Sequence, residues 1–171
     1  GKLGIWAWAA SRLLDYALTR DVLDHSRISV IGHSRLGKTA LLAGMLDERF
    51  YCAFSNDSGC SGASIARETG GETIADICRV FPFWFCDNYR QYAGKPETMP
   101  HDQHFLGACV YPRHLYIASA ELDYWADQTE QMKKSLDLQI LSLGLAVLLC
   151  TAYSLRYASS EVDMVVLEQY H

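Results

Sequence analysis

Apolar residues recur with helical spacing near the start of the chain. Between residues 3 and 20 this spacing predicts an amphipathic helix, with its apolar positions on one face. That face consists of Ile5, Trp6, Ala9, Leu13, Tyr16 and Ala17. Residues 21–26 read as a polar turn, and the β-branched run at 27–31 is typical of a covered strand in a parallel sheet. Apolar runs at 50–56 and 114–120 predict two more buried strands.

Helices and loops are predicted between and after these strands. The helix-compatible segments are 39–46, 72–79, 102–110 and 127–135. The Gly- and Ser-rich segment 57–71 and the proline-containing 94–100 are predicted loops. This alternation of helices and strands predicts an α/β fold with a parallel sheet.

A polar residue follows the end of each predicted strand. Ser34 follows the first, Asp57 the second and Asp123 the third. Functional groups of parallel sheets collect beyond the carboxyl ends of the strands. These three side chains are therefore candidates for one site.

The segment that follows the first predicted strand fits more than one known motif. Residues 32–39 read Gly-His-Ser-Arg-Leu-Gly-Lys-Thr. They satisfy the phosphate-binding pattern G-x-x-x-x-G-K-[ST], although His33 to Leu36 crowd a loop that normally holds small residues. They also suit a nucleophile elbow, in which Ser34 sits on a sharp strand-to-helix turn. A third interpretation is that Ser34 only caps the following helix.

Composition narrows the classes of function. The 171 residues are half hydrophobic, enough for one domain with a substantial core. The net charge is −5 and no basic cluster exceeds Lys133-Lys134, which argues against a nucleic-acid partner. The six cysteines show no zinc-ligand spacing, so no metal is expected. Buried free thiols are the favoured state, with one or two disulfides as the alternative for an exported protein.

Several segments together resemble a known family. They are the motif at 32–41, Ser-Asn-Asp-Ser-Gly-Cys at 55–60, Gly-Glu-Thr at 71–73, Phe-Pro-Phe-Trp-Phe-Cys at 81–86, Asp-Gln-His at 102–104 and Ala-Ser-Ala-Glu-Leu-Asp-Tyr-Trp-Ala-Asp at 118–127. The chain is similar, from about Gly4 to Gln131, to the glucuronoyl esterases of carbohydrate esterase family 15, especially the bacterial members. The resemblance implies an α/β-hydrolase that cleaves esters between glucuronic acid groups of xylan and lignin alcohols, without a cofactor.

The resemblance also implies catalytic roles. Ser34 is expected to be the nucleophile, and Arg35 is expected to stabilise the oxyanion. Asp123 matches the acid that orients the catalytic histidine in many bacterial members. Asp57 lies where fungal members carry their acid, a glutamate, and is the alternative.

Three further positions match residues that hold the sugar. Lys38 and Glu72 are expected on hydroxyl groups and Trp125 against the ring. Structural roles are open for each: Lys38 as a solvated helix residue, Glu72 as a helix-start carboxylate and Trp125 as a packed side chain. Asp57 likewise suits a turn, and Arg67 is expected to pair with a carboxylate.

The base of a serine esterase is not evident. The histidines are His25, His33, His101, His104, His114 and His171. None has the loop context after the last strand in which the family places its base. Residues 1–134 are therefore expected to form a partial hydrolase domain and 135–171 a divergent apolar tail. We expect the chain alone to be inactive or nearly so.

Within that tail, residues 138–155 carry no charge. A buried helix, a strand pair or a tail that is not the natural one is favoured over a membrane span, for which this length is marginal.

Other functions also fit the sequence: a different carbohydrate esterase, such as one that removes acetyl groups from xylan, a nucleotide-binding enzyme, or a carbohydrate-binding protein that lacks the base. The expected partner of the leading hypothesis is glucuronoxylan or a lignin–carbohydrate ester. Because that polymer lies outside the cell, the resemblance implies a secreted or periplasmic protein, although no signal peptide is visible in this chain.

Overall fold

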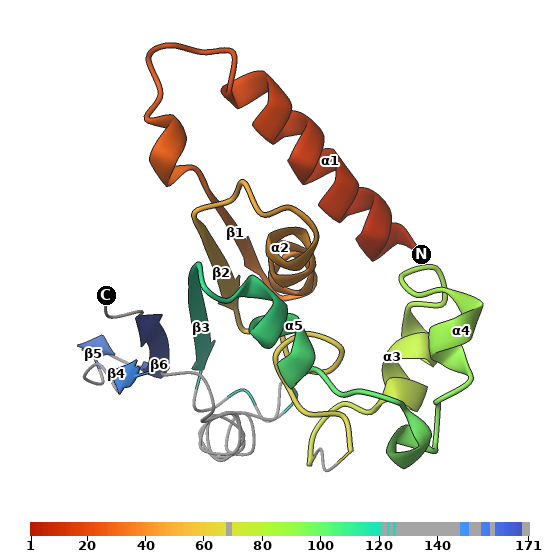
Figure 1. The fold of residues 1–171 in the computed structure, drawn as a ribbon. Helices are drawn as coiled ribbons and strands as arrows, with labels where there is room; N and C mark the ends of the chain where they lie inside the picture. The colour runs from red at the N-terminus through yellow and green to blue at the C-terminus, as the bar shows by residue number, and fades with distance from the viewer. Residues whose placement is uncertain are drawn as a thin grey trace.

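The computed structural model describes residues 1–67 and 70–120, Asp123 and Trp125, and the backbone of 148–150, 155–157 and 160–168. The elements in chain order are α1 (Lys2–Ala17), η1 (His25–Arg27), β1 (Ser29–His33), α2 (Arg35–Leu46), β2 (Cys52–Asn56), α3 (Ile74–Val80), α4 (Asp87–Arg90), η2 (Pro96–Thr98), α5 (His104–Val110), β3 (His114–Ala120), β4 (Leu148–Cys150), β5 (Leu155–Tyr157) and β6 (Ser160–Glu168) (Figure 1). The predicted helix at 127–135 lies outside the described residues.

The first three strands form a parallel sheet, as predicted. β2 pairs with both β1 and β3, and the register places His33 opposite Asn56 and Asn56 opposite Ala118. The carboxyl ends of the three strands are therefore level with one another. β6 runs antiparallel to β3, and β4 and β5 each pair with β6. The α/β prediction is confirmed.

Helix α1 packs through a face other than the predicted one. Its buried residues are Leu3, Ala7, Ser11 and Leu14. Ile5, Leu13 and Tyr16 are instead 63%, 71% and 64% exposed. Small side chains explain the difference, because Ala7 lets the helix lie close to Ala43 of α2, where a bulkier residue would hold it away.

Strand β1 is less covered than its sequence predicts. It begins at Ser29 rather than at residue 27, because Asp24 accepts a hydrogen bond from the Ser26 amide at 3.0 Å and caps the short helix η1. Val30 packs into the core, whereas Ile31 is 74% exposed. Within the described residues, β1 has only β2 as a neighbour, so the prediction of a covered strand is wrong here.

The core between α2, α5 and the sheet positions the motif at the start of α2. Leu41, Ala53, Val110 and Leu115 form a buried cluster. A Cβ at Gly44 would lie 2.6 Å from the Ala53 Cβ, so this glycine permits the close approach of α2 to β2. Helix α2, which follows Ser34, is thereby held against the sheet.

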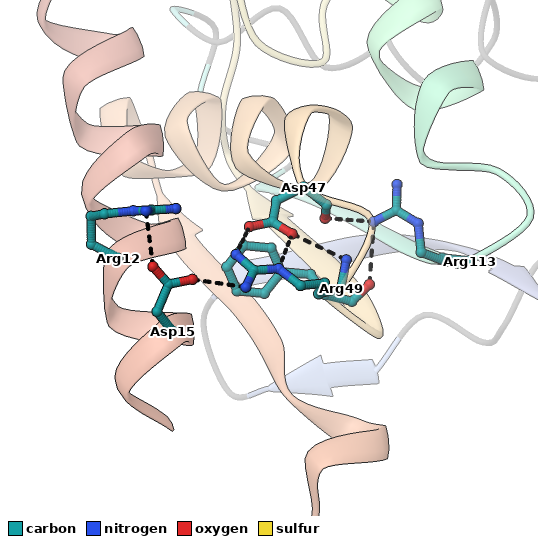
Figure 2. Close-up of polar contacts among 6 residues, drawn as sticks. Arg12, Asp15, Asp47, Arg49 and Arg113 are labelled. Carbon is teal, nitrogen blue, oxygen red and sulfur yellow. Dashed lines mark hydrogen bonds and ion pairs between the residues drawn. The ribbon is translucent and has the colours of Figure 1, made fainter. Parts of the chain in front are cut away.

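A cluster of charges ties elements together at the opposite end of the strands (Figure 2). Arg49 contacts Asp15 of α1 at 2.7 Å and Asp47 at 2.7 Å, and Arg12 pairs with Asp15 at 2.9 Å. The hydrogen bonds from the Arg49 guanidinium lower the pKa of Asp47. Arg113 donates to the Asp47 carbonyl at 3.2 Å. This cluster joins the loop before β2 to α1 and to the loop before β3.

The described thiols are free, as favoured. Cys52, Cys60, Cys78, Cys86 and Cys109 form no disulfide. Burial raises the pKa of Cys52 to about 11 and that of Cys60 to about 12. Cys86 and Cys109 are exposed, so the expectation of buried thiols fails at these two positions.

Most of the uncharged segment 138–155 lies outside the described residues. Residues 148–150 and 155 belong to β4 and β5. No helix in the described part of the chain has the length and apolar character needed to cross a membrane.

Candidate active site

Ser34 lies on a strained turn between β1 and α2. Its backbone has φ 54° and ψ −121°, in the region that non-glycine residues rarely adopt. The Ser34 amide donates to the Asn56 carbonyl at 2.9 Å, which ties the turn to the end of β2. The side chain is exposed. This is the geometry of a nucleophile elbow.

Two glycines make the turn possible. A Cβ on Gly32 would lie 1.9 Å from the Leu36 carbonyl oxygen, and a Cβ on Gly37 would lie 2.7 Å from the Asn56 carbonyl oxygen. Because these neighbours are backbone atoms, a side chain at either position would force the main chain to shift. Gly37 therefore serves the packing of α2 on the end of β2, although it stands three residues after the serine rather than two.

The phosphate-loop interpretation is wrong. Helix α2 begins at Arg35, so the residues that would cradle a phosphate are helical. The Lys38 ammonium, which would reach the phosphates, instead donates to the carbonyls of Ser58 and, at 2.7 Å, of Cys60. The capping interpretation also fails, because within the described part of the chain the Ser34 side chain makes no capping hydrogen bond.

The first turn of α2 presents amide groups beside Ser34. The Lys38 amide bonds the Ser34 carbonyl at 3.1 Å, and the amides before it have no partner within the helix. The amide of Arg35 follows the serine directly, and the Arg35 side chain is exposed. Amides and positive charge at a helix start are suited to a developing oxyanion.

The structure brings the two candidate acids together. The Asp57 amide donates to the Ala118 carbonyl at 2.6 Å, and the Asp123 amide donates to the Ala120 carbonyl at 3.0 Å. The two carboxyl groups are in hydrogen-bonding contact. Burial, followed by this contact and by repulsion from Asp123, raises the pKa of Asp57.

The three predicted sugar-binding residues also lie together. The Glu72 amide donates to the Trp125 carbonyl at 3.1 Å, and the Trp125 side chain donates to the Glu72 carboxylate. Trp125 is 59% exposed, whereas Glu72 and Lys38 are buried. Burial lowers the pKa of Lys38, partly offset by the nearby acidic groups, which include Glu72. Burial raises the pKa of Glu72, opposed by Lys38 and by the Trp125 hydrogen bond.

These contacts bear on the structural alternatives. Lys38 is 6% exposed, so it is not a solvated helix residue. Glu72 precedes α3, whose cap is Thr73, and is held by Trp125 rather than by the helix start. The exposure of Trp125 leaves its indole accessible to a ligand.

Among the described residues, no histidine takes the place of the base. Within residues 1–67 and 70–120, none forms a hydrogen bond with Ser34. His33 lies beside it, but its Nδ1 pairs with the Asn56 side-chain amide at 2.8 Å. His25 and His114 lie at the opposite end of the strands. His104 begins α5, where burial lowers its pKa. His171 lies outside the described residues.

Asp102 braces the loop that leads to Glu72. It is 1% exposed and accepts hydrogen bonds from the amides of Ala66, Arg67 and Gln103 at 2.8, 3.1 and 2.7 Å. The Arg67 guanidinium lies 3.8 Å from it, which confirms the predicted pairing of Arg67 with a carboxylate. Sequence reasoning did not predict the bracing role, since its only local signal is an aspartate before a helix.

Comparison with known proteins identifies the family. A sequence model described as "Glucuronyl esterase, fungi" matches residues 1–136. The solved structure of a promiscuous CE15 esterase from a marine bacterial metagenome superposes with a TM-score of 0.79 at 42% identity. The chain belongs to the glucuronoyl esterases of carbohydrate esterase family 15. That structure covers 84% of this chain, and the chain covers 37% of it.

Curated carbohydrate esterases agree with this assignment. "Carbohydrate esterase MZ0003", from an unknown prokaryotic organism, is 46% identical over 127 residues, or 74% of this chain and 29% of that protein. The 4-O-methyl-glucuronoyl methylesterase of Podospora anserina is 31% identical over 68% of this chain and 26% of its own length. The chain thus spans less than a third of the curated relatives described here, and its identity is higher with the prokaryotic one.

A solved fungal glucuronoyl esterase carries a ligand. The Sporotrichum thermophile enzyme, in a serine-to-alanine variant, is in complex with methyl 4-O-methyl-β-D-glucopyranuronate. It is 27% identical, with a TM-score of 0.69, and the match covers 79% of this chain and 40% of that one. These matches support both the α/β-hydrolase fold and the predicted family.

Proposed function

We propose that this chain forms the nucleophile-bearing part of a secreted serine esterase that hydrolyses 4-O-methyl-glucuronoyl esters between xylan and lignin alcohols. The observation that carries the proposal is the strained Ser34 at the β1–α2 turn, with φ 54°. Such strain at an exposed serine is a common mark of a nucleophile. The family membership and the glucuronate ester held by the Sporotrichum thermophile relative support the substrate class.

The reaction would proceed through an acyl-enzyme. The Ser34 hydroxyl attacks the ester carbonyl, a base takes its proton, and the alcohol leaves with a proton returned by that base. Water then cleaves the glucuronoyl–Ser34 ester. The Arg35 amide and guanidinium stabilise the oxyanion of both steps. Within the described residues no histidine is placed as the base, so this part of the chain does not complete the machinery.

Lys38, Glu72 and Trp125 would hold the sugar. The exposed indole of Trp125 offers a flat surface for a pyranose ring. The Glu72 carboxylate accepts a hydrogen bond from that indole, which fixes its orientation. The Lys38 ammonium donates to the carbonyls of Ser58 and Cys60 and so fixes the path of this segment. Its contribution to sugar binding would therefore include the shape of the backbone beside the site.

A second candidate is carbohydrate binding without turnover. Lys38, Glu72 and Trp125, the proposed sugar-binding residues, lie together in the described residues, whereas no base is placed there. Binding of glucuronoxylan by the chain, without hydrolysis, favours this candidate for the isolated chain.

The test uses a benzyl ester of glucuronic acid and an acetylated xylan as substrates. We expect the 171-residue chain to show no appreciable hydrolysis of either. Appreciable cleavage of the glucuronate ester, abolished by Ser34→Ala, would show instead that the chain carries its own base. Cleavage of acetyl esters alone would assign a different esterase. A fluorophosphonate probe reports separately whether Ser34 is reactive, with Ser34→Ala as its control.

A further inference from the structure

The contact between Asp57 and Asp123 joins two groups that ordinarily repel each other. Each is held there by a backbone hydrogen bond to β3: Asp57 through the Ala118 carbonyl and Asp123 through the Ala120 carbonyl. Asp57 also adopts a left-handed backbone, with φ 49°. The fold therefore places the two backbones side by side on β3.

The immediate surroundings offer Asp57 little compensation. Its Oδ1 is buried and, within the described part of the chain, accepts no hydrogen bond. The Ala120 amide donates to the Asp57 carboxyl, and the nearby charged or titratable groups are His33, Lys38 and Asp123. Two ionised carboxylates are both acceptors, so a hydrogen bond between them requires a proton on one of the pair.

We propose that Asp57 carries this proton and donates it to the carboxylate of Asp123, so that Asp57 is a positioning residue for Asp123. Asp57 is the member with a buried oxygen that lacks a donor, whereas Asp123 Oδ1 accepts the Trp125 amide at 3.1 Å, a bond that favours a carboxylate. The raised pKa of Asp57 agrees with this assignment.

The arrangement has a consequence for the proposed esterase, on whose function this part of the inference rests. Asp123 is held between Asp57 and the Trp125 amide. A carboxylate fixed in this way is suited to orient a histidine. As the hydrogen-bond donor to Asp123, Asp57 would not serve as a second, interchangeable acid.

The test is a carboxyl ¹³C NMR titration of the purified chain, which needs no esterase activity. We expect the Asp57 carbon to titrate above the ordinary range of an aspartate in the wild type, and this midpoint to shift down in Asp123→Asn. Asp87→Asn, on exposed α4, is the matched control and should leave the midpoint in place. Amide spectra check that each variant is folded.

The thermal midpoint gives a second measurement. Asp57→Asn keeps a donor for Asp123, so it should not lower the melting temperature at pH 7, whereas Asp57→Ala should. The proposal is overturned if the NMR titration midpoint of Asp57 in the wild type lies in the ordinary range of an aspartate, or if Asp123→Asn leaves that titration midpoint unchanged. A Ser34 that does not react with the fluorophosphonate probe counts against the proposed esterase but does not affect this result, so the two proposals fail separately.

Discussion

Replacement of Asp102 should be among the most damaging single changes in this chain. Its Oδ1 accepts the amides of Ala66 and Gln103, and its Oδ2 accepts the amide of Arg67. Asp102→Ala leaves three amides without their acceptor in a site that is 1% exposed. Each buried unsatisfied group costs about 1–3 kcal/mol, and water that enters the space would relieve part of this. We expect a loss of about 3–5 kcal/mol in the free energy of unfolding.

Asp102→Asn gives a graded comparison. The amide oxygen of asparagine can keep the bonds from Ala66 and Gln103, whereas its NH₂ group would face the Arg67 donors. One bond is lost and the interaction with the guanidinium is removed, so we expect a loss of about 1–2 kcal/mol. The variant also keeps the experiment informative if Asp102→Ala does not fold, since domains have only about 5–15 kcal/mol of stability.

Urea unfolding followed by far-UV circular dichroism measures these losses. The control is Asp87→Ala, because the Asp87 side chain is 97% exposed in its pair with Arg90 and surface changes usually alter stability by less than about 0.5 kcal/mol. If Asp102→Ala unfolds at the same urea concentration as Asp87→Ala, the bracing role of Asp102 is refuted.

Three other substitutions test the packing and charges of the site. Gly37→Ala should lower the free energy of unfolding in urea by about 2 kcal/mol or more, because its Cβ would lie 2.7 Å from the Asn56 carbonyl oxygen. The control Gly4→Ala, whose Cβ would have nothing within 4 Å, should be neutral or stabilising by up to about 1 kcal/mol. Arg49→Met should lower the melting temperature, and less so in 1 M salt, because it breaks the ion pairs shown in Figure 2. The pKa of Lys38 is lowered in the folded state, so above that pKa the unfolded state binds more protons than the folded state. The stability of the wild type relative to Lys38→Met should therefore rise as the pH increases through the lowered pKa. A stability difference that stays constant between pH 7 and 10.5 would contradict this.

Local sequence patterns predicted an element's bounds well where particular residues in the sequence end the element. β3 spans His114–Ala120, the predicted range, because Pro112 excludes the strand before it and the apolar run ends after it. The face of α1 was predicted wrongly because Leu3, Ala7 and Leu14 also recur with helical spacing, so the spacing did not decide which face packs. Close packing of two helices favours small residues, and that preference is not visible in hydrophobicity alone.

The candidate residues were predictable as a set but not in their contacts. Ser34 and Asp57 follow parallel strands and Asp123 follows the third, so a shared edge was expected. That the Lys38 ammonium binds the carbonyls of Ser58 and Cys60 depends on the path of the loop after β2, which no periodicity encodes. The start of α2 was also missed, because the helix begins at Arg35 rather than at the predicted residue 39.

The two aspartates show where sequence reasoning stops. Sequence treats Asp57 and Asp123 as alternatives, since each follows a strand and either suits a catalytic acid. The register of β2 against β3 places Asn56 opposite Ala118, so the residues that follow the two strands emerge side by side. The Asp57 amide donates to the Ala118 carbonyl and the Asp123 amide donates to the Ala120 carbonyl, two residues further along β3. The two carboxyl groups are therefore in contact. A choice between two acids thus becomes a question of which one holds the proton, and burial of the Asp57 oxygen answers it.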